Sequence, residues 1–207
     1  IGRPVSQLKL ENLGAYQTDP MALFYQTGYL TLKSYDSRRK RYTVGYPNRE
    51  VEQCLLSDIL SYYVPGDNDV HSTIADLSDA LENGNPQCFV DLLTAFLANV
   101  PSHLGNRVAK YENYYHTIIY CVVSLLELDV SAEYNTSEGF IDLLIKTNDY
   151  IYIVELKVNG DALSAMLQIE EKHYEALFLS DVRKLYKIGL GLSPEGRTIT
   201  SIEIRER

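Results

Sequence analysis

The clearest alternation of apolar and polar residues lies between residues 140 and 158. Residues 150–157 read Tyr-Ile-Tyr-Ile-Val-Glu-Leu-Lys, and β-branched and aromatic residues of this kind are typical of a half-buried strand. Because residues two apart share a face, Glu155 and Lys157 lie on the same side as the two isoleucines of this run. Residues 140–147 predict a second strand, and Asn148 and Asp149 between the two suit a tight hairpin turn.

A two-residue turn would place Asp142 directly opposite Glu155. Opposed residues have Cβ atoms about 4.5–5.5 Å apart, and two like charges there are destabilising. Both faces of both strands are largely apolar, as in a sheet that is covered on each side, and buried carboxylates need partners. We therefore predict a site for Mg²⁺ or Mn²⁺, since such hard cations take oxygen ligands and often only one or two carboxylates. The alternative is a charged, solvent-facing side of a half-exposed sheet.

Hydrophobic spacing elsewhere predicts several helices and further strands, one of which contains Glu133 and follows the long helix. The predicted helices cover residues 50–62, 70–81, 87–99, 106–128 and 161–173, and the other strands cover residues 29–33, 41–44, 185–192 and 198–205. Asp161 is the expected N-cap of the last helix. This order predicts an α/β fold with a mixed sheet flanked by helices at residues 66–207. A small N-terminal hairpin and helical module would precede it at residues 1–65, although one continuous fold is the alternative.

Composition and charge narrow the class of protein. The 207 residues are 45% apolar, which is enough for a real core. No apolar run approaches the roughly 20 residues of a membrane span, and the start of the chain has no signal-peptide pattern. The three cysteines have no zinc-like spacing, so we expect reduced core thiols in a cytoplasmic protein. We predict no membrane partner.

The ordered set of motifs resembles a known family. Asp142, twelve residues and then Glu155-x-Lys157 resemble the signature of the PD-(D/E)XK nuclease superfamily. More narrowly, Glu-x-x-Tyr-His at 112–116, Gly-x-x-Asp at 139–142 and Gln-Ile-x-x-x-x-Tyr at 168–174 resemble the nuclease-like domain that follows the ATPase region in predicted AAA-ATPase-like proteins. Residues 24–31 and 47–51 resemble the linker region of those proteins. The resemblance covers nearly the whole chain.

This resemblance implies a restriction-endonuclease-like topology and metal-dependent hydrolysis of a phosphodiester bond. It assigns the metal to Asp142 and Glu155, with Glu112 as the acid that a preceding helix supplies. Lys157 would position or help deprotonate the attacking water, and Gln168 would orient that water or a phosphate oxygen. The residues alone leave open that Glu112 reaches solvent and that Gln168 is an ordinary surface residue.

Other residues near these motifs have simpler interpretations. His116 is expected to be a hydrogen-bonded core histidine, and Tyr174 a packing residue. Glu133, in the strand after the long helix, is a weaker acidic candidate for the site.

The resemblance also implies that this is the C-terminal part of a longer protein. Its ATPase domain is then one expected partner, and nucleic acid, with DNA preferred, is the other. Two departures from the family pattern are Ile141 in place of the proline and Phe140 in place of a basic residue. The loss of a basic residue removes a phosphate contact and puts catalytic competence in question.

The net charge of −9 argues against tight non-specific binding to duplex DNA, which depends on Lys and Arg. The densest basic segment, residues 38–41, is either a solvated turn or a contact to nucleic acid or an acidic partner. Two alternatives to a nuclease therefore stay open. One is a catalytically inactive module that binds nucleic acid or a partner and regulates the ATPase, and the other is a hydrolase of small nucleotides. The oligomeric state cannot be predicted.

Overall fold

The structure is a computed structural model, and it describes the chain except residues 1–3, 7–9, 11–19, 64–69, 100–110 and 194–197. The side chains of Pro4, Tyr63 and residues 111–117 are also outside the description. Contacts divide the chain into two units, Ile1–Asp58 and Ile59–Arg207. The boundary predicted near residue 65 lies outside the described residues and stays a prediction.

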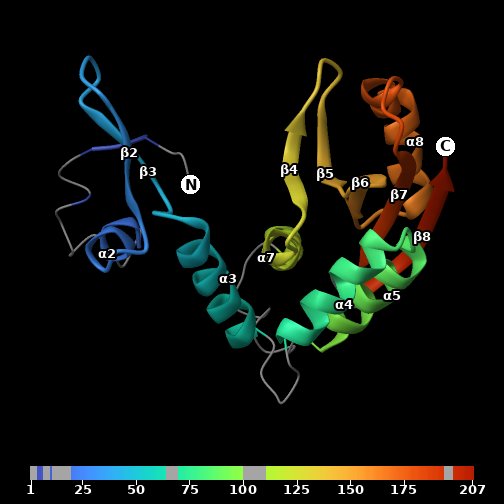
Figure 1. The fold of residues 1–207 in the computed structure, drawn as a ribbon, viewed down its shortest axis with the longest axis horizontal. Helices are drawn as coiled ribbons and strands as arrows, with labels where there is room; N and C mark the ends of the chain where they lie inside the picture. Colours follow the sequence, from blue (N-terminus) through green and yellow to red (C-terminus); the bar gives the residue numbers. More distant parts are fainter. Residues whose placement is uncertain (1–3, 7–9, 11–19, 64–69, 100–110, 194–197) are drawn as a thin grey trace. The chain divides into compact units, whose positions relative to one another are not determined.

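The first unit contains a small antiparallel sheet in the order β1-β3-β2, of which Figure 1 labels β2 and β3. Its elements are β1 (Pro4–Val5), α2 (Met21–Gln26), β2 (Thr31–Asp36), β3 (Arg41–Gly45) and most of α3 (Arg49–Tyr63). Its core is formed by Val5, Leu10, Leu30 and Val44, with five partly buried side chains around them. The predicted early hairpin and the helix that follows it are confirmed.

The basic segment at residues 38–41 forms the turn of this early hairpin and its tip. All four side chains are exposed. The Asp36 carboxylate accepts the backbone N–H groups of Arg38 and Arg39 at 3.0 and 3.1 Å, which closes the turn. This geometry is that of a solvated turn, and contact with a partner stays a prediction.

The second unit is a five-stranded mixed sheet with helices on both faces. Its helices are α4 (Val70–Glu82), α5 (Pro86–Ala98), α7 (Tyr111–Leu125), α8 (Ala162–Glu171) and the short 3-10 helix η2 (Tyr174–Phe178). Its strands are β4 (Asp129–Asn135), β5 (Phe140–Lys146), β6 (Tyr150–Val158), β7 (Lys184–Ser193) and β8 (Thr198–Glu206). They lie in the order β4-β5-β6-β7-β8, with β6 and β7 parallel and the other neighbours antiparallel. The predicted mixed α/β class is therefore confirmed.

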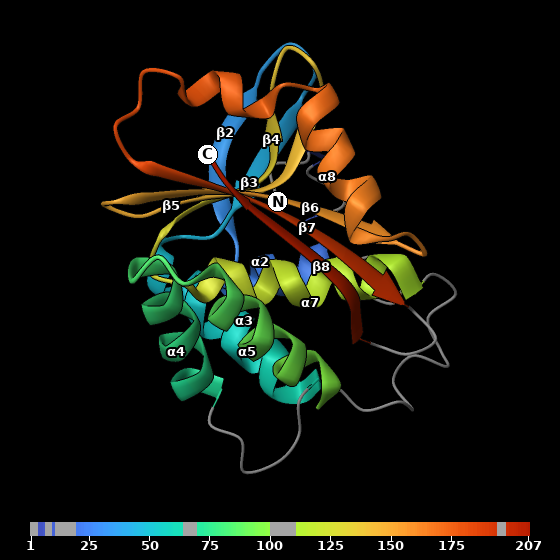
Figure 2. The same ribbon diagram turned by 90° about the vertical axis from the view of Figure 1, so that its right-hand side faces the viewer.

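The two faces of β6 point to different helices, as its alternation predicts. Figure 2 shows α8 on one face of the sheet and α4 and α5 on the other. Ile151 and Ile153 pack beneath α8 with Met166 and Ile169. On the opposite face, the buried Tyr152 hydroxyl donates to the Leu81 carbonyl at the end of α4, at 2.6 Å. Both faces of the strand are thus buried, and the alternative of a half-exposed sheet is wrong for β6.

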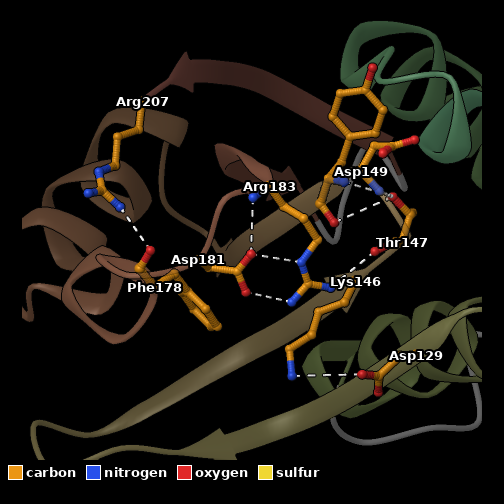
Figure 3. Close-up of polar contacts among 9 residues, drawn as sticks. Asp129, Lys146, Thr147, Asp149, Phe178, Asp181, Arg183 and Arg207 are labelled. Atoms are coloured by element: carbon orange, nitrogen blue, oxygen red, sulfur yellow. Dashed lines mark hydrogen bonds and ion pairs between the residues drawn. The ribbon is translucent and has the colours of Figure 1, made fainter.

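The turn between β5 and β6 is clamped by the segment that leads into β7 (Figure 3). The Arg183 guanidinium donates to both oxygens of Asp181, at 2.9 and 2.7 Å. Its remaining nitrogen donates to the Thr147 carbonyl at 3.0 Å. Within the turn, the Thr147 hydroxyl accepts the Tyr150 N–H at 3.0 Å. These bonds stabilise the two-residue turn of the hairpin.

Two expectations about the helices and cysteines need correction. The long helix ends at Leu125 rather than near residue 128, and the part of it predicted before residue 111 lies outside the described residues. All three cysteines are free, but only Cys121 is a core thiol, and burial raises its pKa to about 11. Cys54 is exposed and Cys88 half-buried, so the core assignment was wrong for Cys54.

Within the described ranges, no helix combines the length and the apolar character that crossing a bilayer requires.

Candidate functional site

Asp142 on β5 and Glu155 on β6 lie side by side, and the predicted register is confirmed. Leu143 opposite Val154 is the last regular pair of this ladder, and the two acids occupy the next position. At that position, side-chain carboxylates accept the backbone N–H groups of the opposite strand. Glu155 Oε1 accepts the Asp142 N–H at 3.3 Å, and Asp142 Oδ2 accepts the Leu156 N–H at 2.8 Å. Each carboxylate therefore holds an amide of the opposite strand.

Glu155 is the most perturbed acid of this pair. Its side chain is 0% exposed, whereas Asp142 is half-buried. Burial and, to a smaller extent, the negative charge of Asp142 together raise the pKa of Glu155 to about 8, and Lys157 opposes this shift only in part. A strongly shifted carboxyl beside a second acid is the pattern found at many functional sites.

Gln168 on α8 connects Glu155 to Lys157. Its amide nitrogen donates to Glu155 Oε2 at 2.8 Å. Its amide oxygen accepts a short hydrogen bond from the Lys157 ammonium. The ion pairs between described residues do not include Lys157 with Glu155, so the amide stands between the two charges. The structure thus brings together four of the five predicted site residues.

Two glycines on β7 let α8 approach the sheet closely enough for this contact. Gly189 pairs with Glu155 and Gly191 with Lys157 across the parallel β6–β7 ladder. A Cβ at Gly189 would collide with the Ala162 carbonyl in the first turn of α8. A Cβ at Gly191 would lie 2.7 Å from the Gly160 carbonyl, just before that helix. Side chains at these positions would therefore push α8, and with it Gln168, away from Glu155.

The start of α8 is also fixed locally. The Asp161 side chain accepts the Ser164 N–H at 2.8 Å, which is the predicted N-cap. The Ala162 N–H donates to the Ser201 hydroxyl on β8 at 2.8 Å. The helix is thus anchored to the sheet at its first residue.

Tyr174 packs next to the site, and its predicted packing role is confirmed. It is buried in the core cluster with Ile141 and Met166. Its hydroxyl donates to the Phe140 carbonyl at 2.8 Å. Gly139 has a φ of 149°, and a Cβ there would lie 3.2 Å from this hydroxyl, so a glycine suits both the backbone and the contact.

The other acidic candidates are placed less fully. Glu112 lies in the first turn of α7, and its side chain is outside the described part of the chain, as is that of His116. Their predicted roles stay predictions. Glu133 lies on β4 with a left-handed φ of 49° and an exposed side chain. No group of three or more acidic, histidine or cysteine side chains suited to a metal occurs among the described residues.

An open hollow of about 680 Å³ lies beside the acids. Its lining includes Asp142 and Gln168 from the site, together with Phe140, Leu167 and Lys172. A solute in this hollow reaches Asp142 directly, whereas Glu155 is buried behind it.

The donor set fits a hard divalent cation. Both adjacent acids offer only oxygen, and one or two carboxylates are what Mg²⁺ commonly takes from a protein. The charges of Glu155 and Asp142 disfavour each other, as the raised pKa of Glu155 shows, and a cation between them would relieve this repulsion. Each carboxylate also keeps acceptor capacity beyond the hydrogen bonds described.

Sequence reasoning missed Gly189, Gly191 and Arg183, which position the site without forming it. An isolated Gly inside a strand pattern does indicate close approach of another backbone, so the two glycines carried a usable signal. Arg183 carried none, because Thr147, whose carbonyl it holds, lies 36 residues earlier in the chain.

This chain is similar to a known family and to a known protein. Residues 110–202 match the family model described as the PD-(D/E)XK nuclease superfamily, and the mixed sheet with its flanking helices is consistent with that fold. A protein of Azotobacter chroococcum mcd 1, described as an uncharacterized protein in the vnfD 5' region, is 31% identical over 189 residues. These cover 88% of this chain and 37% of that relative, so the chain spans little more than a third of the relative's length.

Proposed function

We propose that the second unit is a nuclease domain that hydrolyses phosphodiester bonds with a bound Mg²⁺ or Mn²⁺. The observation that carries the proposal is the contact between two opposed carboxylates, Asp142 and Glu155, and the Gln168–Lys157 pair beside them. All four residues lie inside the region that matches the PD-(D/E)XK nuclease superfamily.

Asp142 and Glu155 would hold the cation, and Glu112 is the candidate for a third carboxylate. A bound divalent cation lowers the pKa of a water and neutralises charge on a phosphoryl group. Asp142 borders the open hollow, so it is the acid that a substrate meets first. The backbone bonds to the Asp142 and Leu156 amides keep the two carboxylates in place before any ligand arrives.

Lys157 would hold the attacking water and stabilise the negative charge that develops on the phosphate. Gln168 keeps the Lys157 ammonium away from Glu155, so the lysine does not neutralise that carboxylate. Glu155 therefore stays available to bind the cation, and the Lys157 ammonium stays available to contact the substrate. Gln168 is thus proposed as a positioning residue.

We also propose that this domain works with an ATPase region in a longer protein, and that its substrate is nucleic acid. The similarity of residues 24–31 and 47–51 to the linker of AAA-ATPase-like proteins supports the first point, and the greater length of the Azotobacter protein leaves room for such a region there.

Metal binding and cleavage test the proposed function together. We expect saturable Mg²⁺ or Mn²⁺ binding by calorimetry in the wild type, and its loss in Asp142→Ala and Glu155→Ala. Metal-dependent cleavage of nucleic acid should fall by at least about a thousandfold in both, because several kcal/mol of charge stabilisation disappear. Asp149→Ala is the matched control, an exposed acid at the other end of the same hairpin, and should behave as the wild type.

Normal cleavage by either site variant would refute the assignment. The second candidate, a catalytically inactive module that binds nucleic acid or a partner, is favoured by the net charge of −9 and by Phe140. It would be supported if the wild type bound no metal and cleaved nothing.

A further inference from the structure

The aromatic ring of Phe140 is exposed at the edge of the hollow that contains Asp142. Phe140 is 58% exposed, although Phe is usually buried. Leu167 from α8, which lines the same hollow, is 55% exposed. The Phe140 backbone is held firmly by the Tyr174 hydroxyl and by its pairing with Asn135 on β4. The ring is therefore an apolar surface on a well-held backbone, two residues before a proposed metal ligand.

The charges around this ring do not suit a duplex. The acids Glu138, Asp142 and Glu171 line the hollow, against one base, Lys172, among the described residues. A duplex carries one negative charge per about 1.7 Å of its axis, twice the density of a single strand, and tight binding needs many Lys and Arg contacts. A single strand carries less charge and exposes base faces that stack on aromatic rings.

Lys172 is suited to contact one phosphate. It caps the C-terminal end of α8, is exposed, and is not in the ion pairs formed between described residues. It also lines a second hollow of about 280 Å³, with Thr136, Ser137 and His173. The two hollows share Glu138, Lys172 and Tyr174, so they are neighbours, and Lys172 lies between them.

We propose that the site takes an unpaired nucleic-acid strand, with a base stacked on Phe140 and a neighbouring phosphate bound by Lys172. This inference rests on the proposed function and names its substrate class. Phe140 then supplies by stacking the affinity that a basic residue at this position would supply by charge, and it selects strands whose bases are free.

The test is binding of short fluorescein-labelled probes to the full chain, measured by anisotropy with Ca²⁺ in place of Mg²⁺. The probes are a DNA strand, the RNA strand of the same sequence, and the DNA duplex. We expect both single strands to bind more tightly than the duplex, and Phe140→Ala to weaken single-strand binding by about tenfold, as expected for one lost base stack. Phe140→Trp, which keeps an aromatic face, should restore it.

The matched control is Leu163→Ala, which removes a 54% exposed apolar side chain from α8 outside the hollow and should change nothing. Tighter binding of the duplex, or unchanged binding by Phe140→Ala, would overturn the inference. If Asp142→Ala loses metal-dependent cleavage but Phe140→Ala changes neither cleavage nor binding, the proposed function stands and this inference fails. If single strands bind through Phe140 and are never cleaved, the inference stands and the proposed function fails.

Discussion

The two ends of the β5–β6 hairpin use polar groups in opposite ways. At the turn, each nitrogen of the Arg183 guanidinium donates to Asp181 or to the Thr147 carbonyl, so charges of opposite sign are paired. At the open end, two acids face each other, and one of them, Glu155, is completely buried and has a raised pKa. The charges at the turn therefore stabilise the hairpin, whereas the Asp142–Glu155 pair at the open end is unfavourable.

The difference shows how a folded chain can hold such a pair. The turn and the apolar ladder fix the register, so Asp142 and Glu155 cannot separate without breaking the strand pairing between them. The energetic cost at the open end is therefore offset by the remainder of the hairpin, as is common at functional sites. Three changes test this contrast.

The largest effect should come from pH acting on Glu155. Its pKa in the folded chain, about 8, lies above its ordinary value of 4.5. The stability that this group contributes is thus fully present below about pH 4.5 and is lost as pH rises to about 8. Without metal, the free energy of unfolding should fall over this range by up to about 1.4 kcal/mol per pH unit, the limit for one proton.

Urea denaturation of wild type and Glu155→Gln at several pH values measures this slope. The variant cannot ionise at this position, so the difference between the two curves isolates Glu155. Asp181 serves as the opposite case, because Arg183 lowers its pKa to about 2 and its contribution is lost only in acid. Parallel curves for the two proteins between pH 5 and 8 would show that Glu155 is not strained.

The next effect should come from Gly189→Ala. The new methyl group meets the Ala162 carbonyl, so α8 has to move. We expect a loss of about 2–3 kcal/mol in the free energy of unfolding, as for an overpacked core. Cleavage should fall as well, because Gln168 moves away from Glu155 and Lys157. Denaturation and a cleavage assay on the folded variant check both results, and unchanged stability would show that the close approach of α8 is not needed.

The smallest and most local effect should come from Arg183→Ala. The Thr147 carbonyl and Asp181 lose a hydrogen-bond partner at the turn. The hydrogen bonds that Asp142 and Glu155 make to backbone amides are unchanged. Hydrogen exchange should become severalfold faster at the Tyr150 amide and stay unchanged at the Leu156 amide. Equal acceleration at both amides would mean that the two ends of the hairpin are not independent.

Most of the fold could be predicted because its signals are local. The alternation of residues 150–157 and the Asn148-Asp149 turn were sufficient to place Asp142 opposite Glu155, and the ladder confirms that register. Helix ends were less certain. The sequence between Leu125 and Asp129 has no Gly or Pro to mark the end of α7, so the predicted helix ran on to residue 128.

The arrangement of the site depended more on contacts between distant segments. Gln168 was a candidate, but its link between Glu155 and Lys157 follows from the approach of α8 to the two glycines of β7, about twenty residues further along the chain. The exposure of Cys54 was missed because a cysteine among apolar residues of a helix gives no sign of which side faces solvent. Metal binding and catalysis stay predictions.

The register of the hairpin also limits which insertions and deletions the site can tolerate. Twelve residues separate Asp142 from Glu155, and the two acids meet because each strand contributes the same number of steps from the turn. One residue added to β5 alone would carry Asp142 to the opposite face of the sheet, the side of Tyr152 and α4. Homologous hairpins that keep this carboxylate pair can therefore differ in length only when both strands lengthen or shorten together. An even number of intervening residues, more than any particular residue between them, is then the property by which distant sequences can be aligned at this site.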